Sequence, residues 1–483
     1  MIRILHWFRR DLRLNDNAAF SAAAHDSAGM VLPLFILDDA LLQGRFASAA
    51  RSTWLLAGLR ALDAELRARG SRLIVRRGDP QQILPALAAE LDAAGVYWNR
   101  DYTPYAIKRD STIKAQLKAD GRSARSFKDG VIFEMDDVLS GGGTAYTVYT
   151  PYARTWRKQL TPADYALQTV PELGAPAQWP ASDPIPEPSE LGLDVTHPLP
   201  AAGEQAALAS LAQFLDLRRN QGIADYAEQR NLPGSPGTSR LSPYLRLGML
   251  GIRTCLRAAL ERADANPQTP QNTRDSIDTW VSELIWRDFY VQVLYHHPHV
   301  LSGAFRQEYD RLDWPNDEGL FAAWQAGRTG YPIVDAAMRQ LRREGWMHNR
   351  ARMIVASFLT KDLLVDWRWG ERHFMQLLID GDPAANNGGW QWAAGTGTDA
   401  QPYFRIFNPV SQGKKFDPEG AYVRRYVPEL ANVPNKFIHE PHTMAPAEQI
   451  RADVQVGRDY PAPIVDHKQQ RERALALYAR VKK

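Results

Sequence analysis

The chain has 483 residues, enough for two or more domains that each bury a core. A net charge of +3 and 45% hydrophobic residues exclude a disordered or strongly charged polypeptide, yet permit a local basic surface that binds a polyanion. The single cysteine, Cys255, excludes an internal disulfide, and no apolar run approaches the length of a membrane span.

The opening segment, MIRILHWFRRDLRLND, has arginines where a secretory signal peptide needs apolar residues. With one cysteine in the chain, this predicts a cytoplasmic protein without membrane association.

Residues 1–130 alternate short apolar runs with alanine-rich amphipathic stretches. This alternation is typical of a doubly wound, Rossmann-like parallel sheet covered on both faces by helices. The predicted strands are Ile2–Trp7, Val31–Leu37, Arg72–Val75, Gly95–Asn99 and Ala124–Phe127, and the clearest helices are Ala49–Arg69 and Pro80–Ala93.

Residues 131–202 predict a long inter-domain connector. Between Thr161 and Pro200 there are nine prolines and few periodic apolar positions, which favours extended chain on the surface.

Residues 203–483 predict an all-helical domain. The expected helices are Glu204–Asn220, Ser242–Arg262, Arg274–Tyr295, Glu318–Ala326, Ile333–Arg343, Trp346–Leu364, Trp369–Asp380 and a charged C-terminal helix from Asp466. Nine of the 14 tryptophans lie between residues 280 and 392, which indicates a stacking or redox site, although large helical cores also collect indoles.

Two segments of the helical half combine polar and aromatic groups. The hydroxyl-rich loop 238–245 leads into a helix and offers oxygens and free N–H groups to an anion, although taken alone it favours a helix N-cap. In segment 280–290, helical spacing places Glu283, Arg287 and Tyr290 on one face. A glutamate buried between indoles has a raised pKa and remains a proton donor; the alternative is an exposed salt bridge.

Two further segments carry recognition groups. In segment 345–353, Gly345 ends one helix, so that Asn349 and Met353 share a face of the next. In segment 380–392, two carboxylates, two amides and two indoles around glycines would be costly in a plain core and suit a polar, planar cofactor. His296, His297 and His299 have no cysteine or acidic partner at ligand spacing, so no metal site is predicted.

These segments, together with the motifs at residues 7–17, 329–339 and 404–409, resemble the photolyase/cryptochrome family. The resemblance extends to about residue 430 and is greatest to class I photolyases. It implies an α/β antenna-binding domain at 1–130, a connector at 131–202 and an all-α domain at 203–483 that holds FAD in a U shape.

The resemblance also implies site residues. The FAD pocket would comprise Tyr226, Thr238, Ser239, Arg240, Leu241, Ser242, Trp280, Arg287, Asp380, Gly381, Asp382 and Asn386. Contacts to the lesion and to DNA would come from Arg230, Glu283, Trp286, Asn349, Arg350, Met353 and Trp392. Glu283 and Asn349 would act in catalysis, and a photoreducing relay would comprise Trp390, Trp367 and Trp314.

The implied activity is light-driven repair of cyclobutane pyrimidine dimers by a carbon–carbon lyase. Excited, reduced FAD would pass an electron to the flipped lesion between Trp286 and Trp392, while Glu283 stabilises the radical anion. Asn386 would face the flavin N5, where plant-type cryptochromes have an acid and animal cryptochromes a cysteine. Photolyases for 6-4 products have histidines at the positions of Asn349 and Met353.

The expected partner is ultraviolet-damaged DNA, and the chain is expected to be a monomer without a protein partner. A second, antenna chromophore is expected in the N-terminal domain. Folate-binding members often have Asn-Glu where this chain has Tyr105-Ala106, which favours 8-hydroxy-deazaflavin over methenyltetrahydrofolate. The alternatives are a cryptochrome-type photoreceptor, a 6-4 photolyase, and a non-photochemical flavoprotein that leaves Glu283 and Asn349 without a purpose.

Overall fold

The computed structural model describes residues 2–176, 178–265 and 267–481, and the chain divides into two compact units. The first comprises residues 1–224, 239–298 and 379–384, and the second comprises residues 225–238, 299–378 and 385–483. The predicted domain boundaries at residues 130 and 202 follow the character of the sequence rather than compactness, and they stay a prediction.

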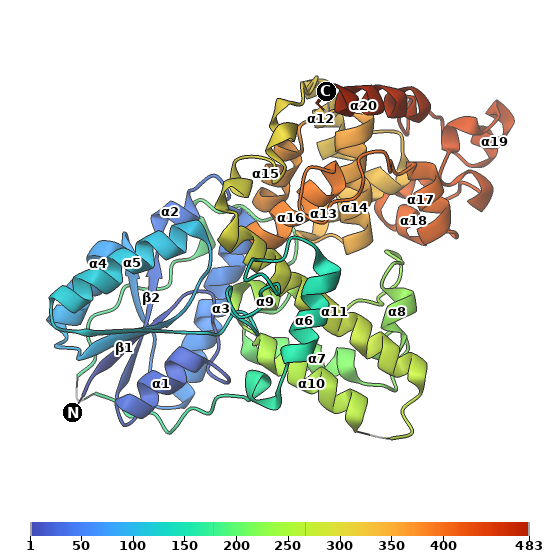
Figure 1. Ribbon diagram of the computed structural model, residues 1–483. Coiled ribbons are helices and arrows are strands. Elements are labelled where there is room, and N and C mark those ends of the chain that lie inside the picture. Colours follow the sequence, from blue (N-terminus) through green and yellow to red (C-terminus); the bar gives the residue numbers. More distant parts are fainter. Residues whose placement is uncertain (1, 177, 266, 482–483) are drawn as a thin grey trace. The chain divides into compact units, whose positions relative to one another are not determined.

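The first unit contains a five-stranded parallel sheet with the order β3-β2-β1-β4-β5. Its three inner strands β2, β1 and β4 are buried along their whole length, as expected when helices cover both faces. Figure 1 shows α4 and α5 on one side of the sheet and α1 on the other. The predicted doubly wound fold is therefore confirmed, with β1 Ile4–Phe8, β2 Val31–Leu37, β3 Ile74–Arg77, β4 Gly95–Asn99 and β5 Ser123–Phe127.

Side-chain caps explain where several helices of this unit begin. Asn17 accepts a hydrogen bond from Phe20 N at the start of α1, and Asp79 accepts one from Gln81 N at the start of α4. The helices are α1 Ala18–Asp26, α2 Asp39–Leu42, α3 Ala49–Ala68, α4 Pro80–Glu90, α5 Pro104–Ala119, α6 Tyr149–Gln159, α7 Glu204–Leu215, α9 Ser242–Leu247, α10 Ile252–Asp264 and α11 Gln271–His296.

The helix predicted at residues 242–262 is interrupted. Its first part, α9, ends at Gly248, which has a φ of 64°. A Cβ atom there would lie 1.9 Å from Arg10 O, because the loop after β1 crosses this point, and Leu12 N donates to Leu247 O. The break is therefore set by a segment distant in sequence, which no local pattern reports.

The predicted connector is partly helical and partly extended. Helix α6 occupies residues 149–159, and the chain beyond it follows the outer edge of the sheet. There Asp183 N donates to Val75 O, and Ser182 Oγ accepts from Val75 N. This pairing covers the backbone groups of edge strand β3 that would otherwise be open to another strand.

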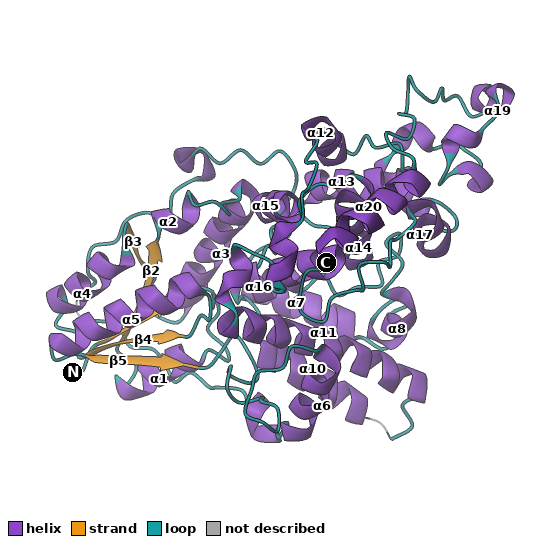
Figure 2. Ribbon diagram, turned by 45° about the horizontal axis from the view of Figure 1, so that its top comes forward, coloured by secondary structure: helices purple, strands orange, loops and turns teal. Residues whose placement is uncertain are grey.

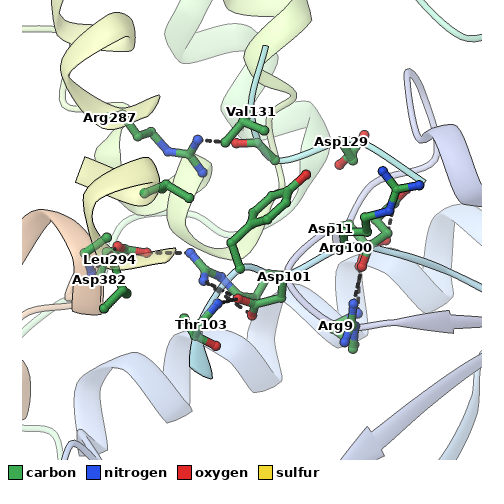
Figure 3. A pocket seen from close by; sticks show the side chains of 16 residues that line it. Arg9, Asp11, Arg100, Asp101, Thr103, Asp129, Val131, Arg287, Leu294 and Asp382 are labelled. Atoms are coloured by element: carbon green, nitrogen blue, oxygen red, sulfur yellow. Dashed lines mark hydrogen bonds and ion pairs between the residues drawn. The ribbon is translucent and has the colours of Figure 1, made fainter. Parts of the chain in front are cut away.

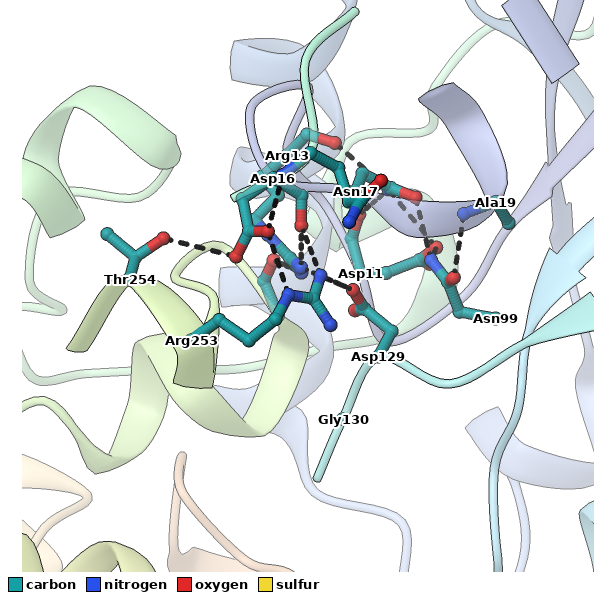
Figure 4. A network of polar contacts seen from close by, with 12 residues as sticks. Asp11, Arg13, Asp16, Asn17, Ala19, Asn99, Asp129, Gly130, Arg253 and Thr254 are labelled. Carbon is teal, nitrogen blue, oxygen red and sulfur yellow. Dashed lines mark hydrogen bonds and ion pairs between the residues drawn. The ribbon is translucent and has the colours of Figure 1, made fainter. Parts of the chain in front are cut away.

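The N-terminal motif at residues 7–17 forms a buried polar network (Figure 4). Asp129 Oδ1 accepts hydrogen bonds from Arg13 and from Arg253 of α10, each at 2.7 Å. Arg253 also pairs with Asp16 at 2.8 Å. Burial opposes the charge of Arg13, but Asp129 and Asp16 outweigh this effect and raise its pKa. The network ties the loop after β1 to a helix, so the motif has a structural role.

The described residues of the second unit form helices joined by loops, with no strand and one isolated bridge, between Val456 and Tyr460 (Figure 2). The helix predicted at residues 346–364 begins only at Asn349, capped by His348, and changes to a π-helical turn at Phe358–Asp362. The helices are α8 Tyr226–Gln229, α12 Glu318–Ala326, α13 Pro332–Glu344, α14 Asn349–Ser357, α15 Trp367–Leu377, α16 Pro383–Ala394 (which starts in the first unit), α17 Pro409–Phe416, α18 Ala421–Tyr426, α19 Pro446–Arg451 and α20 His467–Val481.

Candidate functional site

A polar pocket lies at the carboxyl ends of β1 and β4, where the strand order reverses (Figure 3). In open α/β sheets ligands bind at this switch point. Arg10 bridges two carboxylates in its wall, with Nη2 2.5 Å from Asp382 Oδ2 and Nη1 3.4 Å from Asp101 Oδ2. Burial opposes ionisation of Asp101, but the charges of Arg10 and Arg9 outweigh it and lower its pKa to about 2.

Three guanidinium groups, the arginine cluster of Arg10, Arg51 and Arg246, interact with Asp382 of the pocket wall, and Arg10 also lines the pocket itself. Burial lowers the pKa of Arg246 to about 9 and that of Arg51 to about 10, and the charge of Arg10 acts in the same direction on both. Arg246 Nε donates to Gly381 O at 2.6 Å, whereas its buried Nη1 finds no acceptor among the described residues. A buried guanidinium N–H of this kind fits an anionic group of a ligand.

Several predicted FAD residues of the first unit meet one another. Ser242 Oγ donates to Asp380 Oδ2 at 2.7 Å, and Trp280 Nε1 donates to Ser239 Oγ at 3.3 Å. Leu241 between the two serines is buried. Hydroxyls and a carboxylate suit the hydroxyl groups of a dinucleotide, and an indole suits its rings, so these residues fit FAD.

Three other predicted FAD residues belong to the second unit. Asn386 on α16 donates from Nδ2 to Glu371 O at 3.1 Å, Tyr226 begins α8, and Thr238 ends the segment 225–238. The guanidinium of Arg230 lies 5.7 Å from the ring centre of Tyr226. These positions neither add to nor contradict the proposed cofactor contacts.

Helix α11 presents the predicted polar and aromatic face. Glu283, Trp286, Arg287 and Tyr290 are all half-buried, as their helical spacing predicts. Arg287 donates from Nη1 to Gly130 O, and burial lowers its pKa. The face is therefore partly accessible to a ligand.

Helix α14 presents the second predicted face. Asn349 is exposed, and its Nδ2 lies 4.0 Å from Met353 Sδ, so the two side chains do share a face. Between them Arg350 donates to Asn231 Oδ1 at 2.7 Å and lies over the ring of Phe416 at 4.3 Å. Burial, followed by the charge of Arg230, lowers the pKa of Arg350. A positive charge held in this way favours an anionic partner.

The predicted relay tryptophans share one hydrophobic cluster. Trp314, Trp367 and Trp390 are buried in it, and Trp392 packs against it. The ring of Trp390 lies 6.1 Å from that of Trp324, a residue that the sequence singled out only within the tryptophan count.

Two members of the arginine cluster were not predicted from the sequence, because tertiary packing brings them to the site. Arg51 and Arg246 come from separate helices and belong to no local motif.

Within residues 2–176, 178–265 and 267–481, no helix has both the length and the apolar character of a membrane span. In the same ranges, no group of three or more His, Cys, Asp or Glu side chains could hold a metal ion.

Two family models match the chain. The one described as "DNA photolyase" matches residues 4–176, and the one described as "FAD binding domain of DNA photolyase" matches residues 280–480. A deoxyribodipyrimidine photo-lyase of Synechococcus sp. is 45% identical, with 99% of this chain and 97% of that protein covered.

Solved structures are similar over the full length. A class III photolyase from Agrobacterium tumefaciens is 40% identical with a TM-score of 0.92, covering 100% of this chain and 98% of that one. A Synechocystis cryptochrome is 30% identical with a TM-score of 0.87, covering 99% of both chains. The fold and these matches confirm the resemblance read from the motifs, and the chain belongs to the photolyase/cryptochrome family.

Proposed function

We propose that this protein uses light to repair cyclobutane pyrimidine dimers in DNA, as a carbon–carbon lyase that holds FAD. The observation that carries the proposal is the face of α14, where Asn349 and Met353 lie side by side next to Arg350. An amide can pair with the edge of a base, a thioether makes a soft apolar contact, and a guanidinium binds phosphate. The names of the relatives support the same substrate.

In the first unit, the half-exposed indole of Trp286 offers a planar surface to a pyrimidine, and a protonated Glu283 would donate a hydrogen bond to its carbonyl. In the second unit, Trp392 offers another planar surface, while Arg230 and Arg350 neutralise phosphates. A fused pyrimidine pair stacks poorly in the duplex, so its extrusion costs little.

When bound, FAD supplies the light-excited electron donor. Its proposed partners are Tyr226, Thr238, Ser239, Arg240, Leu241, Ser242, Trp280, Arg287, Asp380, Gly381, Asp382 and Asn386. Negative charge that reaches the lesion would be stabilised by Glu283 and Asn349. Trp390, Trp367 and Trp314 would carry electrons inward to an oxidised cofactor. We further propose a cytoplasmic monomer without a protein partner.

The polar pocket at the carboxyl ends of β1 and β4, with Arg9, Arg10 and Arg100 in its lining, supports an antenna chromophore in the first unit. These guanidinium groups suit an acidic group, and the Tyr105-Ala106 pair favours 8-hydroxy-deazaflavin over methenyltetrahydrofolate. Acid extraction followed by absorption spectroscopy identifies the chromophore. A folate spectrum would contradict the proposed antenna and leave the repair function standing.

The repair proposal is tested with two oligonucleotides, one with a single cyclobutane dimer and one with a 6-4 product. With chemically reduced flavin and light, the first should be repaired and the second left intact, and neither should react in the dark. Repair of the 6-4 product would overturn the assignment. Repair of neither would favour a photoreceptor.

Two substitutions separate catalysis from binding. Glu283→Ala should lower repair per absorbed photon more than it lowers affinity for damaged DNA, because the donor acts on charge that develops during the reaction. Arg350→Ala should weaken binding to DNA. It should also make the slope of log K against log salt less steep, by about the contribution of one phosphate contact. Equal effects of both variants on both quantities would contradict the proposed roles.

A further inference from the structure

Helix α6 of the connector segment places an aromatic ring directly on Trp286 of α11. The rings of Tyr149 and Trp286 are parallel within 6°, with centroids 3.6 Å apart. Another parallel pair, Tyr403 and Tyr478, has a separation of 5.5 Å. The indole that the proposed function assigns to the lesion is therefore stacked on one side by a ring of the protein itself.

The phenol is held in this position by a second set of contacts. Its hydroxyl donates to Ser282 O at 2.9 Å, one helical turn before Trp286. Two turns further along α6, Arg157 donates to Ser282 Oγ at 2.8 Å and to Asp278 Oδ1 at 2.6 Å. Burial raises the pKa of Tyr149 to about 12, so the phenol remains a donor at neutral pH. Helix α6 is thus fastened to α11 over the two turns that precede Trp286.

The stack is the closest ring contact of Trp286, whose other ring contacts, to Phe289 and Tyr290, have centroid distances of 5.7 and 5.5 Å. Trp286 is half-buried on a helix surface, where an indole without neighbours exchanges between staggered rotamers. A ring at 3.6 Å limits this exchange to one orientation. When a planar ligand stacks on an already ordered indole, the indole side chain loses less conformational entropy on binding, and the affinity rises accordingly.

We propose that Tyr149 is a positioning residue that orders Trp286 for stacking with a pyrimidine dimer. This inference rests on the proposed function. It makes the connector, through α6, a part of lesion recognition. Tyr149 acts through Trp286 and need not touch the lesion itself.

The test compares two substitutions by their affinity for one oligonucleotide with and without a cyclobutane dimer. Tyr149→Leu removes the ring and should weaken binding to the dimer by roughly threefold to tenfold, which is the range expected for loss of an aromatic pair. Binding to the undamaged strand should not change. Tyr149→Phe keeps the stack and should bind like the parent. Tyr146→Leu removes a half-buried ring that contacts Tyr152 instead, and serves as the matched control.

A double-mutant cycle distinguishes action through the indole from general weakening. In a Trp286→Leu background, Tyr149→Leu should cause no further loss of affinity for the dimer. Additive losses, or an equal loss of affinity for damaged and undamaged strands, would overturn the proposal. If Tyr149→Leu does not fold, Tyr149→Met replaces it with the same expectations, because it keeps an apolar chain without a ring.

The outcomes also separate this inference from the proposed function. A parent protein that binds the dimer no better than undamaged DNA removes the proposed function. A parent that discriminates, together with a Tyr149→Leu variant that discriminates equally well, removes only the role of Tyr149.

Discussion

Asp288 on α11 is a carboxylate that the fold buries at a cost to stability. Its side chain is fully buried, and Oδ2 accepts hydrogen bonds from Ile132 N at 2.9 Å and Trp156 Nε1 at 3.3 Å. Oδ1 is buried without a hydrogen-bond partner among the described residues. Burial raises its pKa from 3.8 to about 6, although Arg287 and the two donors oppose the shift.

The direction of the pH effect follows from this raised pKa. Below pH 3.8 the carboxyl is protonated in both the folded and the unfolded chain, and it causes no pH dependence. As the pH rises towards 6, the unfolded chain releases its proton first, so the folded state loses stability. At about 1.4 kcal/mol per pH unit, the loss from this group reaches about 3 kcal/mol and is complete above pH 6.

Asp288→Asn removes the titration and keeps an oxygen that can accept from Ile132 and Trp156. The free energy of unfolding of the parent, relative to this variant, should therefore fall by about 3 kcal/mol between about pH 3 and pH 7. Urea unfolding followed by tryptophan fluorescence at fixed pH steps measures the difference. Asp313→Asn, at an exposed carboxylate, is the matched control and should follow the parent throughout. A difference that stays constant with pH, or rises, would refute the reasoning.

Three further predictions concern the buried networks. Asp129→Ala leaves two buried guanidiniums without their shared carboxylate and should lower the free energy of unfolding by about 3–5 kcal/mol; a loss below 1 kcal/mol in urea titrations would contradict this. Gly370→Ala would place a Cβ 2.1 Å from the ring of Trp390, so thermal melting should show a loss of about 1–3 kcal/mol, and an unchanged melting temperature would show that the indole moves freely. Trp390→Phe should stop photoreduction of oxidised FAD but allow repair once the flavin is reduced chemically. Trp392→Phe should keep photoreduction but weaken binding of the lesion, because a stacking surface is lost. If both substitutions impair photoreduction and repair equally, both assignments are wrong.

The two fold classes were predictable because they depend on local patterns. Apolar runs such as Val31–Leu37 and Gly95–Asn99 became strands with the predicted ends, and Glu318–Ala326 became a helix with both ends as predicted. The interruption at Gly248 was not predictable, because its cause is the distant loop at Arg10. Helix α6 was not predicted, because the nine prolines between residues 161 and 200 dominate the composition of the connector. The helix ends at Gln159, before this proline-rich stretch begins.

The sequence by itself determined the family and which side chains share a helix face, because both depend on the order and spacing of residues along the chain. Asn349 and Met353 are four residues apart, and one helical turn brings them together. The tertiary structure alone decided which distant groups meet. Arg51 and Arg246 join Arg10 from separate helices, and Tyr149 reaches Trp286 from another segment of the chain. Such pairings depend on how helices pack, and packing is set by the whole core rather than by any window of sequence.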